Sequence, residues 1–424
     1  MFQEVRTVLN MKPYREVLTL PGLRPLLLVS ILARVPMAAS AVVMTLHVVG
    51  LGYGYGPAGL VGAFMTVGSA LGAPLLGRLV DRRGLRPLLI VTTVASAVFW
   101  VAAPSLSYPF LLGSVLLGGL LTLPVFSVVR QSIAALVPPD QRRPAYALDS
   151  MSVEVSFMTG PALAVLLATA VSPEVAMYAI GAGMVLSGVL LFVLDPPTRT
   201  QSESTTPAAP LARRDWLTPR LVGLLALAAA STLVLGGTDV AVVAVLRDAG
   251  QVGWTGAVLT MWATYSLLGG FAYGALSRPV SPLLLTILLG LATIPVGLGG
   301  GQWWLLSLAL LPAGALCAPT LAASSDAVSR LAPASVRGEA MGLHGSAITV
   351  GIAIGAPTAG AVIDASSPAW GFAATGLLGT VIALVVLPLE LRRRQRAATR
   401  PAPAAEPTGE ATLAASGAGS SSPR

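Results

Sequence analysis

Twelve long apolar runs set the strongest limit on what this chain can fold into. Most are about 18 to 25 residues long, the length of helix that crosses a bilayer. Short clusters of Pro, Gly and charged residues separate them, and they lie at residues 25–49, 57–79, 87–104, 109–136, 145–170, 173–194, 219–246, 253–276, 282–299, 303–328, 338–363 and 369–391. A soluble core does not need 54% hydrophobic residues, so the sequence predicts an all-α membrane protein with twelve transmembrane helices.

The residues that build most catalytic and metal sites are scarce. The chain has one cysteine, Cys317, inside a predicted span, and two histidines, His47 and His344. A disulfide framework or a zinc centre needs more ligands, so we expect no metal and no cofactor. The sequence also lacks a phosphate-binding loop, a catalytic cluster and a ring of pore-lining polar residues. We therefore predict that the chain is neither an enzyme nor a channel.

The net charge of +8 is explained by a membrane topology. If the N-terminus is cytoplasmic, the predicted outer loops hold only Arg247, and the inner segments hold Arg6, Lys12, Arg15, Arg24, Arg78, Arg82, Arg83, Arg86, Arg142, Arg143, Arg199, Arg213, Arg214, Arg220, Arg278, Arg330, Arg337 and the cluster at 392–396. Such a bias is typical of cytoplasmic loops. We expect a multi-pass protein of the plasma membrane with both termini cytoplasmic and no nucleic-acid partner.

Two segments, one in the middle of the chain and one at its C-terminal end, are rich in Pro, Ser, Thr and Ala. They have few apolar side chains to bury, so we expect them to be flexible and to mark the limits of the folded parts. The predicted parts are a cytoplasmic N-terminal segment at 1–24, a six-helix bundle at 25–194, a cytoplasmic linker at 195–218, a second six-helix bundle at 219–391 and a disordered cytoplasmic tail at 392–424.

The two predicted bundles are related to each other. A gapless shift of 195 residues brings the fourth and fifth spans onto the tenth and eleventh, and it places Pro138 on Pro333 and Arg142 on Arg337 in the same loop. Two six-helix halves repeated in parallel, with a site at their interface, are the layout of a rocking transporter.

The segment GRLVDRRGLR at 77–86 lies between the second and third spans. It resembles the signature that the major facilitator superfamily carries there, which runs Gly, any, Leu, small, Asp, Arg, any, Gly, Arg, Lys or Arg. The segment departs from this pattern at Leu85, where a basic residue is usual. With the twelve spans, the linker and the repeat, the resemblance covers nearly the whole chain. It implies the major facilitator fold and a gate formed by Gly77, Asp81, Arg82, Arg83, Gly84 and Arg86.

In that family the aspartate lies beside the N-terminus of the eleventh helix, whose positive dipole end favours an anion. Here that helix is expected to begin near Arg337 and Gly338. The resemblance implies a latch that joins the halves when the cytoplasmic side is closed, with Asp81 as the acid available to its neighbouring arginines. The alternative is a positively charged loop with a solvated aspartate.

Small residues are spaced for close helix packing in two places. The pairs Gly68 and Gly72, and Gly351 and Gly355, form small-xxx-small faces, and in the family the second and eleventh helices meet across the interface. Generic helix packing explains either pair equally well. In the fifth span, Gly160 and Pro161 mark a kink point, because proline removes a backbone donor. Gly160 and Pro161 also resemble part of the antiporter signature of the drug-efflux branch, although its other glycines are absent.

Ionisable residues inside spans are costly, and they mark candidate sites. Counting about 1.5 Å per residue places Arg34 and Glu154 both roughly 13 Å deep, where they are expected to pair. Arg130 and Asp149 are shallower, so we assign them to the gate with Asp81.

Two further ionisable residues lie in the second half. Asp239 interrupts the outer half of the seventh span, and His344 occupies the repeat position of Asp149. The candidates for a substrate or proton pathway are Arg34, Glu154, Asp239 and His344. A structural ion pair for Glu154 and a place near the headgroups for His344 remain open.

The sequence favours a secondary-active transporter. Few buried charges and many Met, Leu and Ala suit a small hydrophobic or amphipathic substrate. Our interpretation is proton-coupled efflux by alternating access, with H⁺ as the coupling ion, the bilayer as solvent and a monomer as the working unit. The alternative is a proton-coupled importer of a neutral nutrient on the same fold.

Overall fold

The computed structural model describes residues 11–200, 203, 211–276, 279–299 and 301–398, and these contain helices but no strand. Eleven crossings are long and apolar enough to span a membrane. The twelfth is α13 (Thr255–Ala275), whose 21 residues include three Thr, one Ser, two Tyr and a Trp that lower its hydropathy. The chain is an all-α membrane protein with twelve transmembrane helices in two six-helix bundles.

The first bundle follows a short amphipathic helix, α2 (Lys12–Thr19). Its crossings are α3 (Leu23–Gly50), α4 (Tyr55–Arg83), α5 (Leu85–Ala102), the pair α6 (Tyr108–Leu120) and α7 (Val125–Leu136), α8 (Arg142–Ala170) and α9 (Pro173–Leu194). The fourth crossing is broken before Val125, because Pro124 has no backbone donor and takes a non-helical conformation.

The second bundle follows a four-residue helix, α11 (Arg213–Trp216). Its crossings are α12 (Pro219–Asp248), α13, α14 (Pro282–Thr293) with a 3₁₀ continuation to Gly299, α15 (Trp303–Leu331), α16 (Arg337–Ala365) and α17 (Pro368–Ala398). Helix α17 runs beyond the predicted boundary at 391, because its Arg, Gln and Ala residues are good helix formers. Residues 399–424 of the predicted tail lie outside the described residues, as do 1–10 and, in the linker, 201–202 and 204–210.

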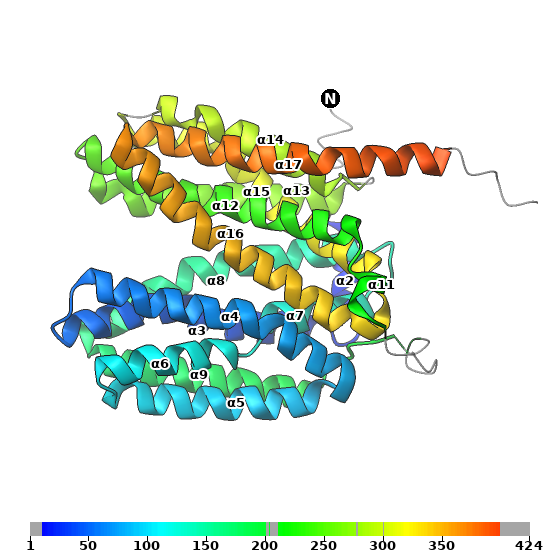
Figure 1. Cartoon of the computed structure of the whole chain (residues 1–424), viewed down its shortest axis with the longest axis horizontal. Coiled ribbons are helices and arrows are strands. Elements are labelled where there is room, and N and C mark those ends of the chain that lie inside the picture. Colours follow the sequence, from blue (N-terminus) through cyan, green and yellow to red (C-terminus); the bar gives the residue numbers. More distant parts are fainter. Residues whose placement is uncertain (1–10, 201–202, 204–210, 277–278, 300, 399–424) are drawn as a thin grey trace, which may run out of the picture.

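The two bundles lie one above the other in Figure 1, and α16 crosses obliquely between them. At one end of the molecule α4 ends with Arg82 and Arg83 and α16 begins with Arg337; we call this the arginine-rich end. Helices α2 and α11 lie at the same end. The arginine-rich end is where segments far apart in the sequence converge.

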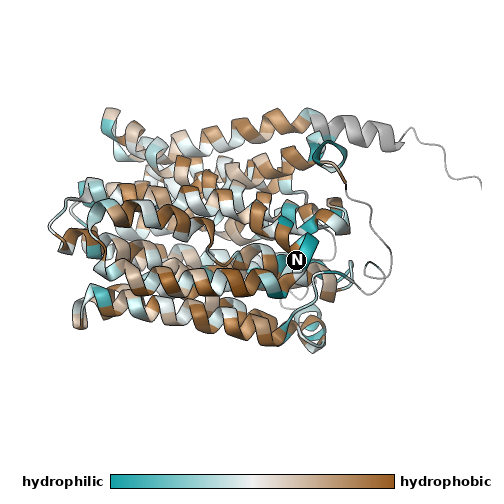
Figure 2. Cartoon of the chain, turned by 60° about the horizontal axis from the view of Figure 1, so that its bottom comes forward, coloured by the Kyte–Doolittle hydropathy of each residue, from teal (hydrophilic) through white to brown (hydrophobic). Residues whose placement is uncertain are grey.

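The long sides of the helices carry the apolar surface. Figure 2 shows hydrophobic colours along the helices and hydrophilic colours gathered near their ends. Large apolar side chains such as Val98, Phe110, Val193 and Val385 are exposed there, between 64% and 74%. In a bilayer these side chains contact lipid, so their exposure matches the solvent that the sequence predicts.

The two small-xxx-small pairs pack helices within a bundle and not across the interface. A Cβ on Gly72 would lie 2.1 Å from the carbonyl oxygen of Leu120, so this pair holds α4 against α6. A Cβ on Gly355 would lie 2.1 Å from the carbonyl oxygen of Leu233, which holds α16 against α12.

Their partners Gly68 and Gly351 make the same intra-bundle contacts. Gly160 likewise packs α8 on α3, and Pro161 lies inside a helix that continues to Ala170. The expected contact of the second and eleventh helices exists, but other residues form it.

Candidate functional site

Asp81 lies at the start of α16, as the sequence predicts. The backbone N–H of Gly338 donates to Asp81 Oδ1 and that of Glu339 donates to Oδ2, both at 2.8 Å. These are the free donors of a helix N-terminus, where the backbone dipole favours an anion. Gln131 of α7 adds a third bond to Oδ1 at 3.2 Å. One carboxylate of the first bundle therefore caps a helix of the second.

Two glycines allow this cap to form. A Cβ on Gly77 would lie 2.1 Å from the carbonyl oxygen of Gly338, and a Cβ on Gly338 would lie 2.5 Å from the carbonyl oxygen of Gly77. The backbones of α4 and α16 are therefore in contact where Asp81 reaches across. Gly84 ends α4 with a φ of 82°, the left-handed region that the expected tight turn needs.

The arginines of the 77–86 segment do not bind Asp81, which corrects our expectation. Arg78 pairs with Glu339 at 3.6 Å, and Arg86 pairs with Asp195 of its own bundle at 2.9 Å. The side chains of Arg82 and Arg83 are exposed. The backbone amides of α16 stabilise the negative charge of Asp81 instead. The arginines of this segment therefore pair with other acids or remain exposed.

Sequence reasoning missed the linker as part of this gate. Glu203 accepts bonds from both terminal nitrogens of Arg337, at 3.1 and 2.8 Å. Partial burial opposes ionisation of this carboxyl, but Arg337 and the Thr200 amide outweigh it and lower the pKa of Glu203 to about 2. Arg199 donates to the backbone oxygen of Asp81 at 2.7 Å. The linker therefore binds both helices of the latch.

Two other contacts across the arginine-rich end had no sequence signal of their own. Arg213 of α11 pairs with Glu339 at 2.6 Å. Tyr14 of α2 donates to the carbonyl oxygen of Phe271 on α13 at 2.5 Å and stacks on its ring. Its hydroxyl fits against Gly274, where a Cβ would lie 2.1 Å away. The amphipathic pattern of 12–19 would have identified a packed helix but not its partner.

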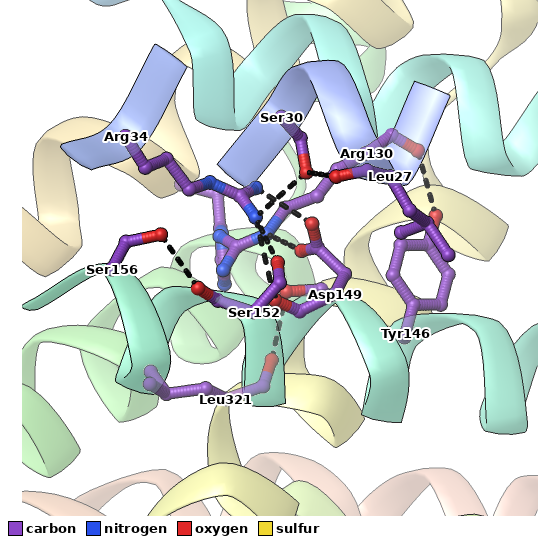
Figure 3. Close-up of polar contacts among 11 residues, drawn as sticks. Leu27, Ser30, Arg34, Arg130, Tyr146, Asp149, Ser152, Ser156 and Leu321 are labelled. Atoms are coloured by element: carbon purple, nitrogen blue, oxygen red, sulfur yellow. Dashed lines mark hydrogen bonds and ion pairs between the residues drawn. The ribbon is translucent and has the colours of Figure 1, made fainter. Parts of the chain in front are cut away.

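Arg34, Asp149 and Arg130 form a buried cluster in the first bundle (Figure 3). Arg34 Nη2 donates to Asp149 Oδ1 at 2.6 Å, and Arg130 Nε donates to Oδ2 at 3.1 Å. Ser152 accepts a further bond from Arg34 at 2.6 Å. Both guanidinium groups lie over the ring of Phe126, at 4.9 and 5.5 Å from its centroid. Two arginines thus share one carboxylate in a buried site.

The expected pair of Arg34 and Glu154 does not form. Asp149 is one turn nearer to the arginine-rich end on α8 and takes both arginines, so it does not join Asp81 as we predicted. Glu154 is half-buried and accepts a hydrogen bond at 2.8 Å from Ser266 of α13, in the other bundle. The sequence did not predict the direction in which each side chain points from α8.

His344 lies at the interface and not among headgroups. Its side chain is fully buried, its Nδ1 is 3.3 Å from Arg130 Nη1, and its Nε2 is 3.0 Å from Ser324 Oγ of α15. Arg130 therefore contacts both Asp149 and His344, the two positions that the internal repeat relates.

Asp239 lines a cavity of about 830 Å³ away from the arginine-rich end. The other walls come from α12 and α16 and include Val240, Val243, Gly360 and Ile363. Asp239 lies nine residues before the end of α12, in the half that the sequence predicts. Glu154 is close enough to interact with it electrostatically. In the part of the chain that the structure describes, no arginine or lysine pairs with Asp239.

A family model decides what this architecture is. The model described as Major Facilitator Superfamily matches residues 26–301 and 248–418. The chain belongs to the Major Facilitator Superfamily. As a member, it is a multi-pass membrane transporter, and Asp81 lies in the segment that suggested the family. No curated protein sequence matches the chain.

Solved structures of transporters share its fold. The human organic anion transporter MFSD10 (TETRAN) is 20% identical, with a TM-score of 0.66 over 88% of this chain and 99% of its own. A bacterial homologue of the iron transporter ferroportin in an outward-facing state is 17% identical, with a TM-score of 0.67 over 87% and 100%. The proton:xylose symporter XylE is 13% identical, with a TM-score of 0.64 over 86% and 95%. Their cargoes differ, so the likeness is one of fold.

Proposed function

We propose that this superfamily member is a secondary-active exporter that exchanges H⁺ for small hydrophobic or amphipathic compounds by alternating access. It works as a monomer in the plasma membrane, with the arginine-rich end and both termini in the cytoplasm. The bias of arginine toward that end supports this orientation. Asp81, Gly77, Gly338 and the linker act as the gate on the cytoplasmic side.

One observation carries the proposal: among the described residues no cation pairs with Asp239, and this carboxylate lines a cavity away from the closed gate that Arg247, Asp248 and Asp364 also line. A carboxylate at membrane depth is stable when it holds a proton or faces water and cargo. Glu154 is a second acid of this kind, because within the described parts of the chain it bonds to Ser266 of the other bundle and to no cation. Protonation of either acid removes a charge from the interior, which couples proton binding to substrate release.

The lining of the cavity supports the substrate class. Val240, Val243, Ala244 and Ile363 offer apolar contact area, and the charged side chains of the cavity suit an amphipathic compound; these are Asp239, Arg247, Asp248 and Asp364. Related folds carry organic anions, iron and xylose according to their descriptions, so the fold does not select among cargoes. The substrate class therefore rests on this chain's own side chains.

Purified protein in liposomes tests the proposal. A pH gradient of either sign is imposed, and fluorescent lipophilic compounds are followed, with a neutral sugar as the importer control. We expect Glu154→Gln and Asp239→Asn to abolish gradient-driven movement while counterflow exchange persists. Asp248→Asn, in the same cavity but at the last residue of α12, is the matched control and retains transport. Gradient-driven movement in both acid variants contradicts proton coupling, and gradient-driven sugar uptake favours the importer.

A further inference from the structure

His344 has one arrangement of hydrogens that satisfies its neighbours. Arginine has no acceptor, so Arg130 Nη1 donates and His344 Nδ1 accepts over 3.3 Å. The proton of the neutral ring is then on Nε2, which donates to Ser324 Oγ at 3.0 Å. The Ser324 hydroxyl in turn donates to the carbonyl oxygen of Leu321 at 3.0 Å. In this closed gate His344 is a neutral acceptor that joins α16 to α7.

A second proton on His344 has no acceptor in this arrangement. It would be placed on Nδ1 and would point at Arg130, so a donor would face a donor and two positive charges would be adjacent. The cluster behind Arg130 cannot absorb this charge, because Asp149 is its one carboxylate and already binds Arg34 as well. Like charges in a buried site repel strongly.

The other elements that pack on α16 bring no compensating charge to His344. Helix α15 presents Ser324, and its nearby acid Asp326 pairs with Arg330 at 2.9 Å. Helix α4 presents Ala70 and Ala73 at this depth. The sequence of α12 has no ionisable residue from 221 to 238, and that of α17 has none from 368 to 389. Along α16, the nearest ionisable side chain is Glu339, five residues away, which pairs with Arg78 and Arg213. Asp81 binds the backbone at the same level as Glu339.

We propose that His344 is a proton-binding site of the gate, and that the arginine-rich end closes only while His344 is neutral. Protonation replaces the bond to Arg130 with a repulsion, and the two bundles separate at this end. The site is distinct from Glu154 and Asp239 and acts whatever the cargo or its direction. A low pH on the arginine-rich side therefore holds the transporter open to that side.

The size of the effect follows from linkage. A histidine exposed in the open state takes up protons with an ordinary pKa of about 6.5, while the closed state takes up none. Under these conditions the ratio of open to closed molecules rises about tenfold when the pH falls from 7.5 to 5.5. The sign is fixed: acid opens the arginine-rich end, and alkali closes it.

Spin labels on opposite bundles measure this ratio without substrate or gradient, so the result is independent of the proposed transport reaction. We would label Asp140→Cys and Pro333→Cys, in exposed loops of the two bundles, in a Cys317→Ala background in nanodiscs. The distance distribution at pH 7.5 and 5.5 is recorded by double electron–electron resonance. The native sequence is expected to shift about tenfold toward the longer distance at pH 5.5.

Three variants complete the test. His344→Asn keeps an oxygen that accepts from Arg130 and takes no proton, so it stays closed at both pH values. The amine of His344→Lys has an ordinary pKa of about 10.4 when exposed, so it is charged in the open state at both pH values and favours that state at both. His47→Asn changes the chain's other histidine, which lies 3.6 Å from Glu174, and it keeps the native response.

An unchanged pH response in His344→Asn, a closed His344→Lys, or no response in the native sequence each overturns the proposal. The last result needs no change at His344 beyond the labelled background, so the proposal stays testable even if a substitution of His344 prevents folding.

Discussion

Substituting Gly77 by alanine tests the gate at its tightest contact. The new Cβ would lie 2.1 Å from the carbonyl oxygen of Gly338, while ordinary contacts begin at 3.4 Å. Helices α4 and α16 must therefore separate by about 1.3 Å, and Asp81 then loses its bonds to the start of α16. The added Cβ is fixed to the backbone of α4, and the oxygen that it meets belongs to the backbone of α16. No side chain can rotate away to relieve the contact.

The expected magnitude follows from this rigidity. Overpacking in a well-packed interior costs about 1–3 kcal/mol, and a contact that cannot relax belongs near 3 kcal/mol. That value lowers the ratio of closed to open molecules roughly 150-fold. The open state does not contain the contact, so the whole penalty falls on the closed state. Gly77→Ala should therefore hold the arginine-rich end open.

The assay is the same pair of labels at positions 140 and 333, at neutral pH. The matched control is Gly62→Ala, on the same helix, where an added Cβ has nothing within 4 Å. We expect Gly77→Ala to show the long distance and the control to show the short one. If both variants give the native distance distribution, the contact of α4 with α16 is not what closes the gate.

Three further predictions concern the contacts around this gate. Asp81→Asn should slow transport but leave substrate binding intact. The variant loses one of the two charge-assisted bonds to α16, each worth about 1.5–3 kcal/mol. Equal transport rates of the variant and the native protein in vesicles would refute this prediction. Tyr14→Phe removes the 2.5 Å hydrogen bond to Phe271 and keeps the ring stack. The rate of amide hydrogen exchange in α2 should rise several-fold, in line with a loss of about 1 kcal/mol. An unchanged exchange rate would show that the hydroxyl does not hold α2 in place. Glu203 has a lowered pKa of about 2, so its bond to Arg337 is complete above the ordinary glutamate pKa of about 4.3 and is lost as the pH falls toward 2. Glu203→Gln should therefore speed tryptic cleavage of the linker at neutral pH, and a native cleavage rate would refute the linker contact.

The fold was accessible from the sequence because lipid imposes simple rules. Every backbone group in a bilayer must be bonded within its own helix, so the length and polarity of each run predict each crossing. The weakest crossing by hydropathy, α13, was still found, because its neighbours and the repeat require a helix there. The boundaries were less exact, as the extension of α17 to Ala398 shows.

The site was accessible only in part. Asp81 was placed correctly at the start of α16 through the family resemblance of its segment, and the attraction between a helix N-terminus and a carboxylate explains the contact. The partner of Arg34 was predicted wrongly, because Asp149 and Glu154 differ by five residues and only their helical phase decides which one faces Arg34. The helical phase of Asp149 and Glu154 identifies the partner of Arg34 only when it is known which face of α8 packs against α3.

Contacts of the terminal and linker segments were missed for another reason. Tyr14, Arg199 and Glu203 lie in segments that look solvated, and their partners are 118 to 257 residues away in the sequence. One sequence carries no signal for such pairs. The repeat, in contrast, pointed to His344 through Asp149, and both residues proved to bind Arg130.

One measurement tests the central claim, that the two bundles close at one end while they open at the other. Two label pairs are compared in nanodiscs, 140 with 333 at the arginine-rich end and Val171 with Gly253 at the opposite end, both made by cysteine substitution in the Cys317→Ala background. We predict that substrate, acid or Gly77→Ala lengthens the first distance and shortens the second in the same molecules. Two distances that lengthen together, or that never change, would contradict alternating access in this protein.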